Sequence, residues 1–322
     1  MRLPTTLAIT LVLTSFGCSG MQTGQNSEHK TLKDFGIRAS NLFLYYDDLG
    51  KATTFYTRTL GMELVGDYGM ASILRIAPTS YLILVQSGEG MHTTAEPRTV
   101  ALALLTDQLE EWFAYLQTTD IEFRSQLTVR EGSAHDGFVV LDPQGYLLEF
   151  ERFNRHAENE KFIPALARSA AIYPKPGASD VPEGLGFGAS VTWQYYKDLE
   201  GIQRFYEDVL GLELVADQGW TKIYQGSRSG FVGLVDESRG MHRFSQDKSV
   251  NVSFIIDDLE GWFEHVRANQ LFELRSPQVS NDAQARYSAF VGFDPENYYM
   301  EFNRFYAHEI HPALFGYLSA NR

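Results

Sequence analysis

Apolar side chains along this sequence recur every two residues in some segments and about every 3.6 residues in others, which indicates alternating strands and helices. Residues 41–47 and 191–197 are aromatic and apolar runs typical of β-strands. Each run leads into an Asp-Leu pair and a helical spacing that ends at Gly61 or Gly211. Shorter strand-like runs follow, and the same order then begins again. The pattern predicts an α+β protein built from βαβββ modules.

The segment 55–69 reappears at 205–219, so the body of the chain contains an internal repeat. Further pairs are Trp112 with Trp262, the Gly-Met-His triplets at 90–92 and 240–242, and the Asp-Pro turns at 142–143 and 294–295. The repeat predicts two tandem domains of two modules each, over 35–155 and 184–310, packed as a pseudo-symmetric pair. A Pro- and Gly-rich stretch lies in the linker predicted over 156–183, and 311–322 is expected to be a C-terminal tail.

Residues 1–18 have the features of a secretory signal peptide. Arg2 supplies positive charge, and the uncharged run 3–16 is too short to span a bilayer. The run ends at Cys18, the only cysteine of the chain, and resembles the end of a bacterial lipoprotein signal, with Ser15 in place of the usual leucine. We therefore expect lipid attachment at Cys18. The alternative is an ordinary signal cleaved nearby.

The residues after Cys18 fit a membrane anchor. Residues 19–34 are mostly polar, which favours a flexible tether between the lipidated cysteine and the first domain. We expect an exported protein held on a membrane of the cell envelope, at its periplasmic or extracellular face. The partners expected are this membrane and a small-molecule ligand.

Composition narrows the class of function. The chain has 322 residues, enough for two domains, and 44% hydrophobic residues, enough for packed cores. Its formal net charge of -14 repels phosphate backbones, so nucleic acid is not an expected partner. A single cysteine cannot form an internal disulfide. Nothing in the composition indicates an oligomeric state.

Two motifs occur once in each repeat: FYxxxLGxxL after the first strand, and DPxGxxxEF or DPxNxxxEF at the end. In this order they resemble the vicinal oxygen chelate superfamily, which includes glyoxalase, bleomycin-resistance proteins and extradiol dioxygenases. The resemblance implies that two βαβββ modules pair into a strongly curved, partly open sheet whose concave face holds the ligand. Four modules would then form two such cups.

The resemblance also implies where a divalent metal would bind: to His, Gln or Glu at the start of each module-opening strand, and to the glutamate of the last strand. Here the opening positions hold poor ligands, namely Asn41, Ala101, Val191 and Asn251. Each cup therefore keeps one strong ligand, Glu149 or Glu301, whereas a stable site needs about three. We expect no metal cofactor; a divalent metal, if bound, would use these two glutamates.

Other polar residues have simpler interpretations. The Gly-Met-His triplets are expected to be turns between modules, with Met91 and Met241 in the core rather than His92 and His242 acting as ligands. Arg152 and Arg304, which follow the last strands, are expected to pair with nearby carboxylates.

The resulting hypothesis is an exported, lipid-anchored protein that binds a small molecule in its concave sheets. The ligand-binding candidates are Glu149, Glu301, Asn41 and Asn251. Burial of the two glutamates without a cation should raise their pKa values. One alternative is a metal-dependent lyase or extradiol-type dioxygenase, and another is a structural lipoprotein that acts through partner surfaces. The sequence assigns no catalytic residue.

The lipid anchor is directly testable. Replacing Cys18 with serine should move the protein from the membrane fraction to the soluble fraction, because the thiol is the attachment point of the lipid. The tether variant Gln22→Ala should stay with the membrane. Equal solubility of wild type and Cys18→Ser would rule the anchor out.

Overall fold

The computed structural model describes residues 30–320, which form four βαβββ modules. The first contains β1 (Ile37–Tyr46), α1 (Leu49–Thr54), β2 (Glu63–Asp67), β3 (Ala71–Ala77) and β4 (Ser80–Gln86). The second contains β5 (Val100–Leu105), α2 (Leu109–Leu116), β6 (Glu122–Thr128), β7 (His135–Leu141) and β8 (Leu147–Phe153). The third contains β9 (Ala189–Tyr196), α4 (Leu199–Arg204), β10 (Glu213–Asp217), β11 (Thr221–Gln225) and β12 (Gly230–Asp236). The fourth contains β13 (Val250–Ile256), α5 (Leu259–Asn269), β14 (Ser280–Asn281), β15 (Tyr287–Phe293) and β16 (Tyr299–Phe305).

The strands form two eight-stranded sheets, which confirms the predicted fold class. Sheet A has the order β14-β15-β16-β13-β1-β4-β3-β2, and sheet B has the order β10-β11-β12-β9-β5-β8-β7-β6. Each sheet therefore combines two modules from different repeats: the first with the fourth, and the second with the third. This differs from the expectation that each repeat forms its own cup.

The reason lies in the pairing of the module-opening strands. β1 pairs antiparallel with β13, and β5 pairs antiparallel with β9. All four strands carry similar apolar patterns, so hydrophobicity alone does not select the partner. The connection 87–99 leads the chain from β4 of sheet A to β5 of sheet B. This connection therefore places the first and second modules in different sheets.

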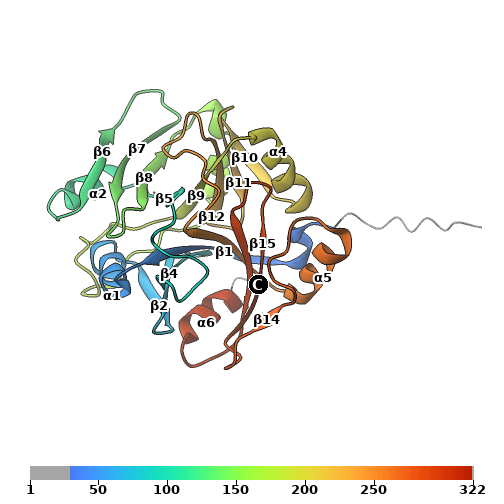
Figure 1. The fold of residues 1–322 in the computed structure, drawn as a ribbon. Helices are drawn as coiled ribbons and strands as arrows, with labels where there is room; N and C mark the ends of the chain where they lie inside the picture. The colour runs from blue at the N-terminus through green and yellow to red at the C-terminus, as the bar shows by residue number, and fades with distance from the viewer. Residues whose placement is uncertain (1–29, 321–322) are drawn as a thin grey trace, which may run out of the picture.

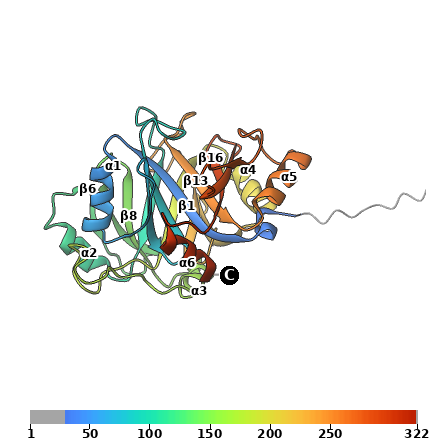
Figure 2. The same cartoon turned by 90° about the horizontal axis from the view of Figure 1, so that it is seen from below.

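The two repeats remain visible in the arrangement of the helices. In both views α1 and α2, of the first repeat, lie on one side of the molecule, and α4 and α5, of the second, lie on the other (Figures 1 and 2). One large apolar core joins the helices to the sheet faces that they cover, through residues such as Leu42, Trp112 and Trp262. Smaller clusters occupy the opposite, concave faces of the two sheets.

The Asp-Pro turns hold the two modules of each repeat together. Asp142, in the turn before β8, accepts hydrogen bonds from the hydroxyls of Tyr46 (2.6 Å) and Tyr56 (2.9 Å) of the first module. Its second oxygen accepts the backbone N–H of Tyr146 at 2.8 Å. Burial raises the pKa of Asp142, although these donors offset part of that effect. The aspartate thus shapes its own turn and fixes the neighbouring module.

Reciprocal contacts confirm that the repeats pack as a pseudo-symmetric pair. The backbone N–H of Thr79 donates to Ser229 Oγ (2.8 Å), and the backbone N–H of Ser229 donates to Thr79 Oγ1 (2.9 Å). Tyr146 donates to the carbonyl of Ser249 and accepts from the backbone N–H of Tyr45. Tyr298 makes the equivalent bonds to Thr99 and Tyr195. These buried tyrosines connect sheet A to sheet B.

Two further helices close one end of each concave face. α3 (Phe162–Leu166) follows β8 of sheet B, and its Phe162 contacts Phe153 and Phe231. α6 (Pro312–Ala320) places Leu314 and Leu318 in the concave cluster of sheet A. The segments expected to be linker and tail therefore contribute packing side chains. None of the helices described within residues 30–320 is long and apolar enough to cross a membrane.

Tyr146 provides a test of the contacts between the sheets. Tyr146→Phe leaves the buried Ser249 carbonyl and Tyr45 N–H without this partner, so the free energy of unfolding should fall by about 2–4 kcal/mol. Urea denaturation followed by fluorescence measures the change. Tyr173→Phe, at a side chain that is 50% exposed, should shift it by less than about 0.5 kcal/mol. Equal stability of the two variants would show that the Tyr146 hydroxyl is dispensable.

Candidate functional site

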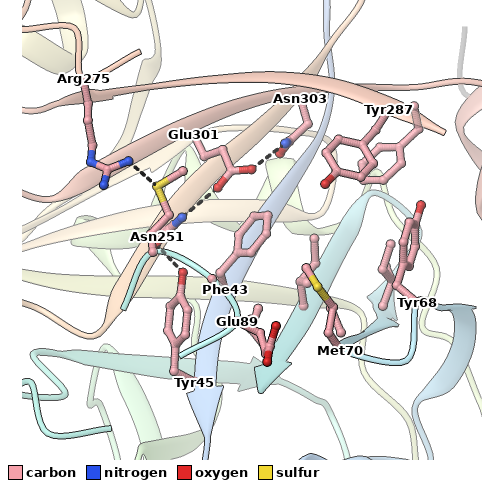
Figure 3. Close-up of a pocket in the computed structure, with 17 residues that line it drawn as sticks. Phe43, Tyr45, Tyr68, Met70, Glu89, Asn251, Arg275, Tyr287, Glu301 and Asn303 are labelled. Carbon is pink, nitrogen blue, oxygen red and sulfur yellow. Dashed lines mark hydrogen bonds between the residues drawn. The ribbon is translucent and has the colours of Figure 1, made fainter. Parts of the chain in front are cut away.

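The concave face of sheet A contains a cavity of about 400 Å³ (Figure 3). Its walls are mainly apolar and come from β1, β3, β4 and β16, with Phe43, Ile73, Ile83 and Phe305 among the lining residues. Tyrosine, methionine and arginine side chains complete the lining: Tyr68, Tyr287, Met70, Met91 and Arg275. The period of two along each strand explains the division, because alternate residues of β1 face either this cavity or the helices.

Glu301 of β16 lies at the polar end of this cavity, between two asparagines (Figure 3). Its Oε2 accepts from Asn251 Nδ2 at 2.7 Å, and its Oε1 accepts from Asn303 Nδ2 at 2.8 Å. The Glu301 side chain is only 8% exposed, and burial raises its pKa despite the two amide donors. The predicted inward orientation and raised pKa of this glutamate agree with the structure.

The polar cluster continues behind Glu301. Tyr45 donates to Asn251 Oδ1 at 2.9 Å, and Ser253 donates to Asn303 Oδ1 at 2.6 Å. Asn41 Nδ2 makes a longer contact of 3.5 Å to the same Asn303 oxygen. Asn41 itself is buried and is not among the residues that line the cavity. The strand pairing thus brings Asn41, Asn251 and Glu301 into one cluster, although their repeats differ.

In the turn at 90–92 the side chains point the opposite way from the prediction, with the histidine buried and the methionine exposed. His92 is buried, its Nδ1 lies 2.5 Å from Glu96 Oε2, and its ring contacts Tyr45 and Tyr299. Met91 is exposed and lines the cavity. Gly90 packs so closely against the Tyr45 ring that a Cβ there would come within 2.9 Å of it. This close approach turns the methionine outward and the histidine inward.

The equivalent turn in the second repeat behaves similarly. Met241 is exposed and lines a cavity at sheet B. His242 contacts the edge of the Tyr195 ring. The expectation that both methionines lie in the core is therefore wrong.

Glu149, the fourth predicted ligand-binding residue, lies in the other cup. It shares the concave face of sheet B with Glu151, and both line cavities there. Burial raises the pKa of Glu149 to about 7, and it raises that of Glu151 further because Glu149 adds like-charge repulsion. The sequence interpretation missed Glu151 and Asn303. Each lies two residues beyond a glutamate already assigned to the concave face, so the strand period of two was the available signal.

The arginines after these strands have structural partners, as predicted. Arg152 donates to both oxygens of Glu110 at 2.7 and 2.8 Å, and Arg304 lies 3.7 Å from Glu260. Both pairs connect a last strand to the helix that covers it.

The residues at the expected metal positions do not fit a divalent ion. In sheet A the expected metal positions hold Asn41, Asn251 and Glu301, of which only Glu301 is a strong ligand. Both oxygens of Glu301 already accept amide N–H groups. In sheet B the opening positions are the apolar Ala101 and Val191 beside Glu149. Within residues 30–320 the structure contains no group of three His, Cys, Asp or Glu side chains suited to a metal.

Comparisons with known proteins agree with this architecture. Residues 38–150 match the family described as the Glyoxalase/Bleomycin resistance protein/Dioxygenase superfamily. Glyoxalase I from Zea mays is 14% identical and superposes with a TM-score of 0.57 over 88% of this chain and 95% of that chain. A candidate dioxygenase from Bacillus subtilis is 14% identical, with a TM-score of 0.55 over 85% and 86%. These low identities show a shared fold. A comparison with curated proteins finds no significant match.

The carboxyls of sheet B should make stability depend on pH. Between about pH 4.5 and pH 7 folded Glu149 holds a proton that the unfolded chain has lost, so the free energy of unfolding should fall as the pH rises. Glu149→Gln should reduce the decline between pH 5 and pH 8 by about 1–3 kcal/mol. Urea titrations at each pH measure it, with Glu111→Gln as the exposed control. If the free energy of unfolding falls with pH as much in Glu149→Gln as in wild type, Glu149 is not the group responsible.

Proposed function

We propose that this chain, which carries a glyoxalase/bleomycin resistance/dioxygenase-type domain at residues 38–150 within a glyoxalase I-like fold, is an exported, lipid-anchored protein that binds small molecules on its concave sheets. The proposal of export and of a lipid at Cys18 rests on the amino-terminal sequence, which lies outside the described residues. The proposal of ligand binding rests on the cavities.

The observation that carries the proposal is the cavity of sheet A, with its mainly apolar walls and one polar end. A volume of about 400 Å³ is within the range of small-molecule sites. Aromatic and aliphatic walls favour a planar or apolar ligand body. The cluster around Glu301 can accept or donate hydrogen bonds at a single end, which would fix the orientation of such a ligand.

The chemistry at the polar end favours a ligand with a carbonyl, hydroxyl or amide group. Each of Asn251 and Asn303 uses one amide N–H on Glu301 and retains a second. Glu301, when protonated, would donate to a ligand oxygen. Arg275 and Glu89 also line the cavity and bring one positive and one negative charge. A ligand oxygen directed toward this end would therefore find donors from several side chains.

The same observations weigh against the two alternatives. The donor set around Glu301 lacks the ligands that a metal-dependent lyase or extradiol dioxygenase would use. A purely structural role would leave no reason for a cavity of this size with a hydrogen-bonded polar end. We therefore place ligand binding first and assign no reaction.

A fragment screen by ligand-observed NMR would test the proposal. Carbonyl-containing aromatic fragments should bind wild-type protein, and Ile83→Trp should abolish binding because the larger ring fills the cavity. Ile83→Phe is the milder variant if the tryptophan impairs folding, which thermal melting would show. Leu64→Trp, on the exposed side of β2 and away from the cavity, should bind like wild type. Hits that bind Ile83→Trp and Ile83→Phe as well as wild type would place the site elsewhere, and no hits at all would refute it.

A further inference from the structure

Sheet B contains a second concave site whose chemistry differs from that of sheet A. A small cavity of about 140 Å³ adjoins a larger one of about 430 Å³, since the two share lining residues. The shared residues include Glu149, Glu151 and Trp220. Trp193 and Phe153 line the smaller cavity only. With Tyr195, two carboxyls and four large aromatic side chains surround a space suited to a small ligand.

Two buried polar atoms in this site have no hydrogen-bond partner. Glu151 is 5% exposed, and its Oε2 makes no hydrogen bond. Trp193 is 6% exposed, and its indole Nε1 makes no hydrogen bond of normal geometry either, although it interacts with the Glu151 carboxyl and lowers the pKa of that group. Both side chains line the smaller cavity. Leaving such groups unpartnered costs stability, which a bound ligand could offset.

The concave glutamate of sheet A has amide hydrogen-bond donors that the glutamates of sheet B lack. There, the single concave glutamate, Glu301, has an amide N–H on each oxygen. Glu149 and Glu151 lie two residues apart on one strand with no asparagine beside them and no arginine or lysine paired to them in the part of the chain that the structure describes. Burial raises the pKa values of both carboxyls, and a hydrogen bond between them lowers the pKa of Glu149 and raises that of Glu151.

A glycine in the neighbouring strand makes room for the flat indole of Trp193 in this site. Gly233 of β12 lies beneath Trp193, and a Cβ at this position would come within 1.9 Å of the indole. The corresponding residue of sheet A is Ile83, which lies beside Phe43. Glycine inside a strand commonly marks such a close approach. The indole therefore lies against the sheet only because residue 233 has no side chain.

The aromatic walls also suit a positive charge. The guanidinium carbon of Arg239 already lies 4.7 Å from the centre of the Trp220 ring. Aromatic faces next to carboxylates form a common environment for ammonium and guanidinium groups. His135, Arg239, Tyr195 and the two glutamates are the titratable groups that line the smaller cavity.

We propose that the concave face of sheet B binds a small organic cation. Its ammonium or guanidinium group donates hydrogen bonds to Glu149 and Glu151, and its hydrocarbon part lies against Trp193 and Trp220. This site extends the proposed ligand binding to the second sheet but does not depend on a ligand in sheet A. A bound cation would supply the charge compensation that Glu301 obtains from asparagines.

Isothermal titration at neutral pH with three matched probes tests the proposal, in the Ile83→Trp background so that the cavity of sheet A is filled. Benzylamine carries the cation, benzyl alcohol is its neutral counterpart, and benzoate carries the opposite charge. Benzylamine should bind about tenfold more tightly than either of the others. Glu149→Gln and Glu151→Gln should each weaken benzylamine binding about tenfold, because each removes one of the two carboxyls that a bound cation would hold ionised. Trp193→Phe, which keeps a ring but loses the indole N–H, should have a smaller effect.

The matched control is Glu111→Gln, at an exposed glutamate of α2 that lines neither cavity of sheet B, and it should leave benzylamine binding unchanged. Unchanged binding in both sheet B glutamate variants would place the cation elsewhere. Equal binding of all three probes, or no binding of benzylamine at millimolar concentration, would overturn the proposal. Neither result would bear on the aromatic fragments expected in sheet A, which the Ile83 variants test separately.

Discussion

The antiparallel pairing of module-opening strands is the interaction on which the rest of this structure depends. β1 with β13 and β5 with β9 form the centre of each sheet, and every other strand is added outward from these pairs. The pairing brings the first and fourth modules together, so Asn41 meets Asn303 although they come from different repeats. Each concave face is therefore formed by one module from each repeat.

Duplication has left two cups with one architecture and different polar chemistry. In sheet A an amide hydrogen-bonds each oxygen of Glu301, so this carboxyl has partners before any ligand arrives, although the nearby Asn41 Oδ1 has none. In sheet B two carboxyls share one strand, and nearby polar atoms remain unpartnered. Internal satisfaction favours a preformed site for a neutral ligand, whereas the unpaired set favours a ligand that carries the missing charge. The same fold thus supports two recognition chemistries in one chain.

The sequence predicted those features that depend on local patterns. The alternation along each strand was enough to place Glu149 and Glu301 on concave faces, and the Asp-Pro turns before them are where they were expected. Arg152 was correctly assigned a carboxylate partner because a neighbouring helix supplies one. Strand partners were not predictable, since the opening strands of all four modules carry similar apolar patterns and the selection depends on the path of residues 87–99. The orientation of Met91 and His92 depends on how Gly90 packs against Tyr45, a contact that no local pattern encodes.

The strand order has a consequence for how the chain folds during synthesis. Sheet B joins consecutive modules, so it can be completed once residue 236 has emerged from the ribosome. Sheet A must wait for the last module, because β1 borders β13, a strand that is made much later. Until then one edge of β1 has no neighbour, and unpaired strand edges are prone to wrong associations. The nascent chain thus carries a finished sheet beside a half-built one, and protection of the β1 edge by a chaperone would matter most in that interval.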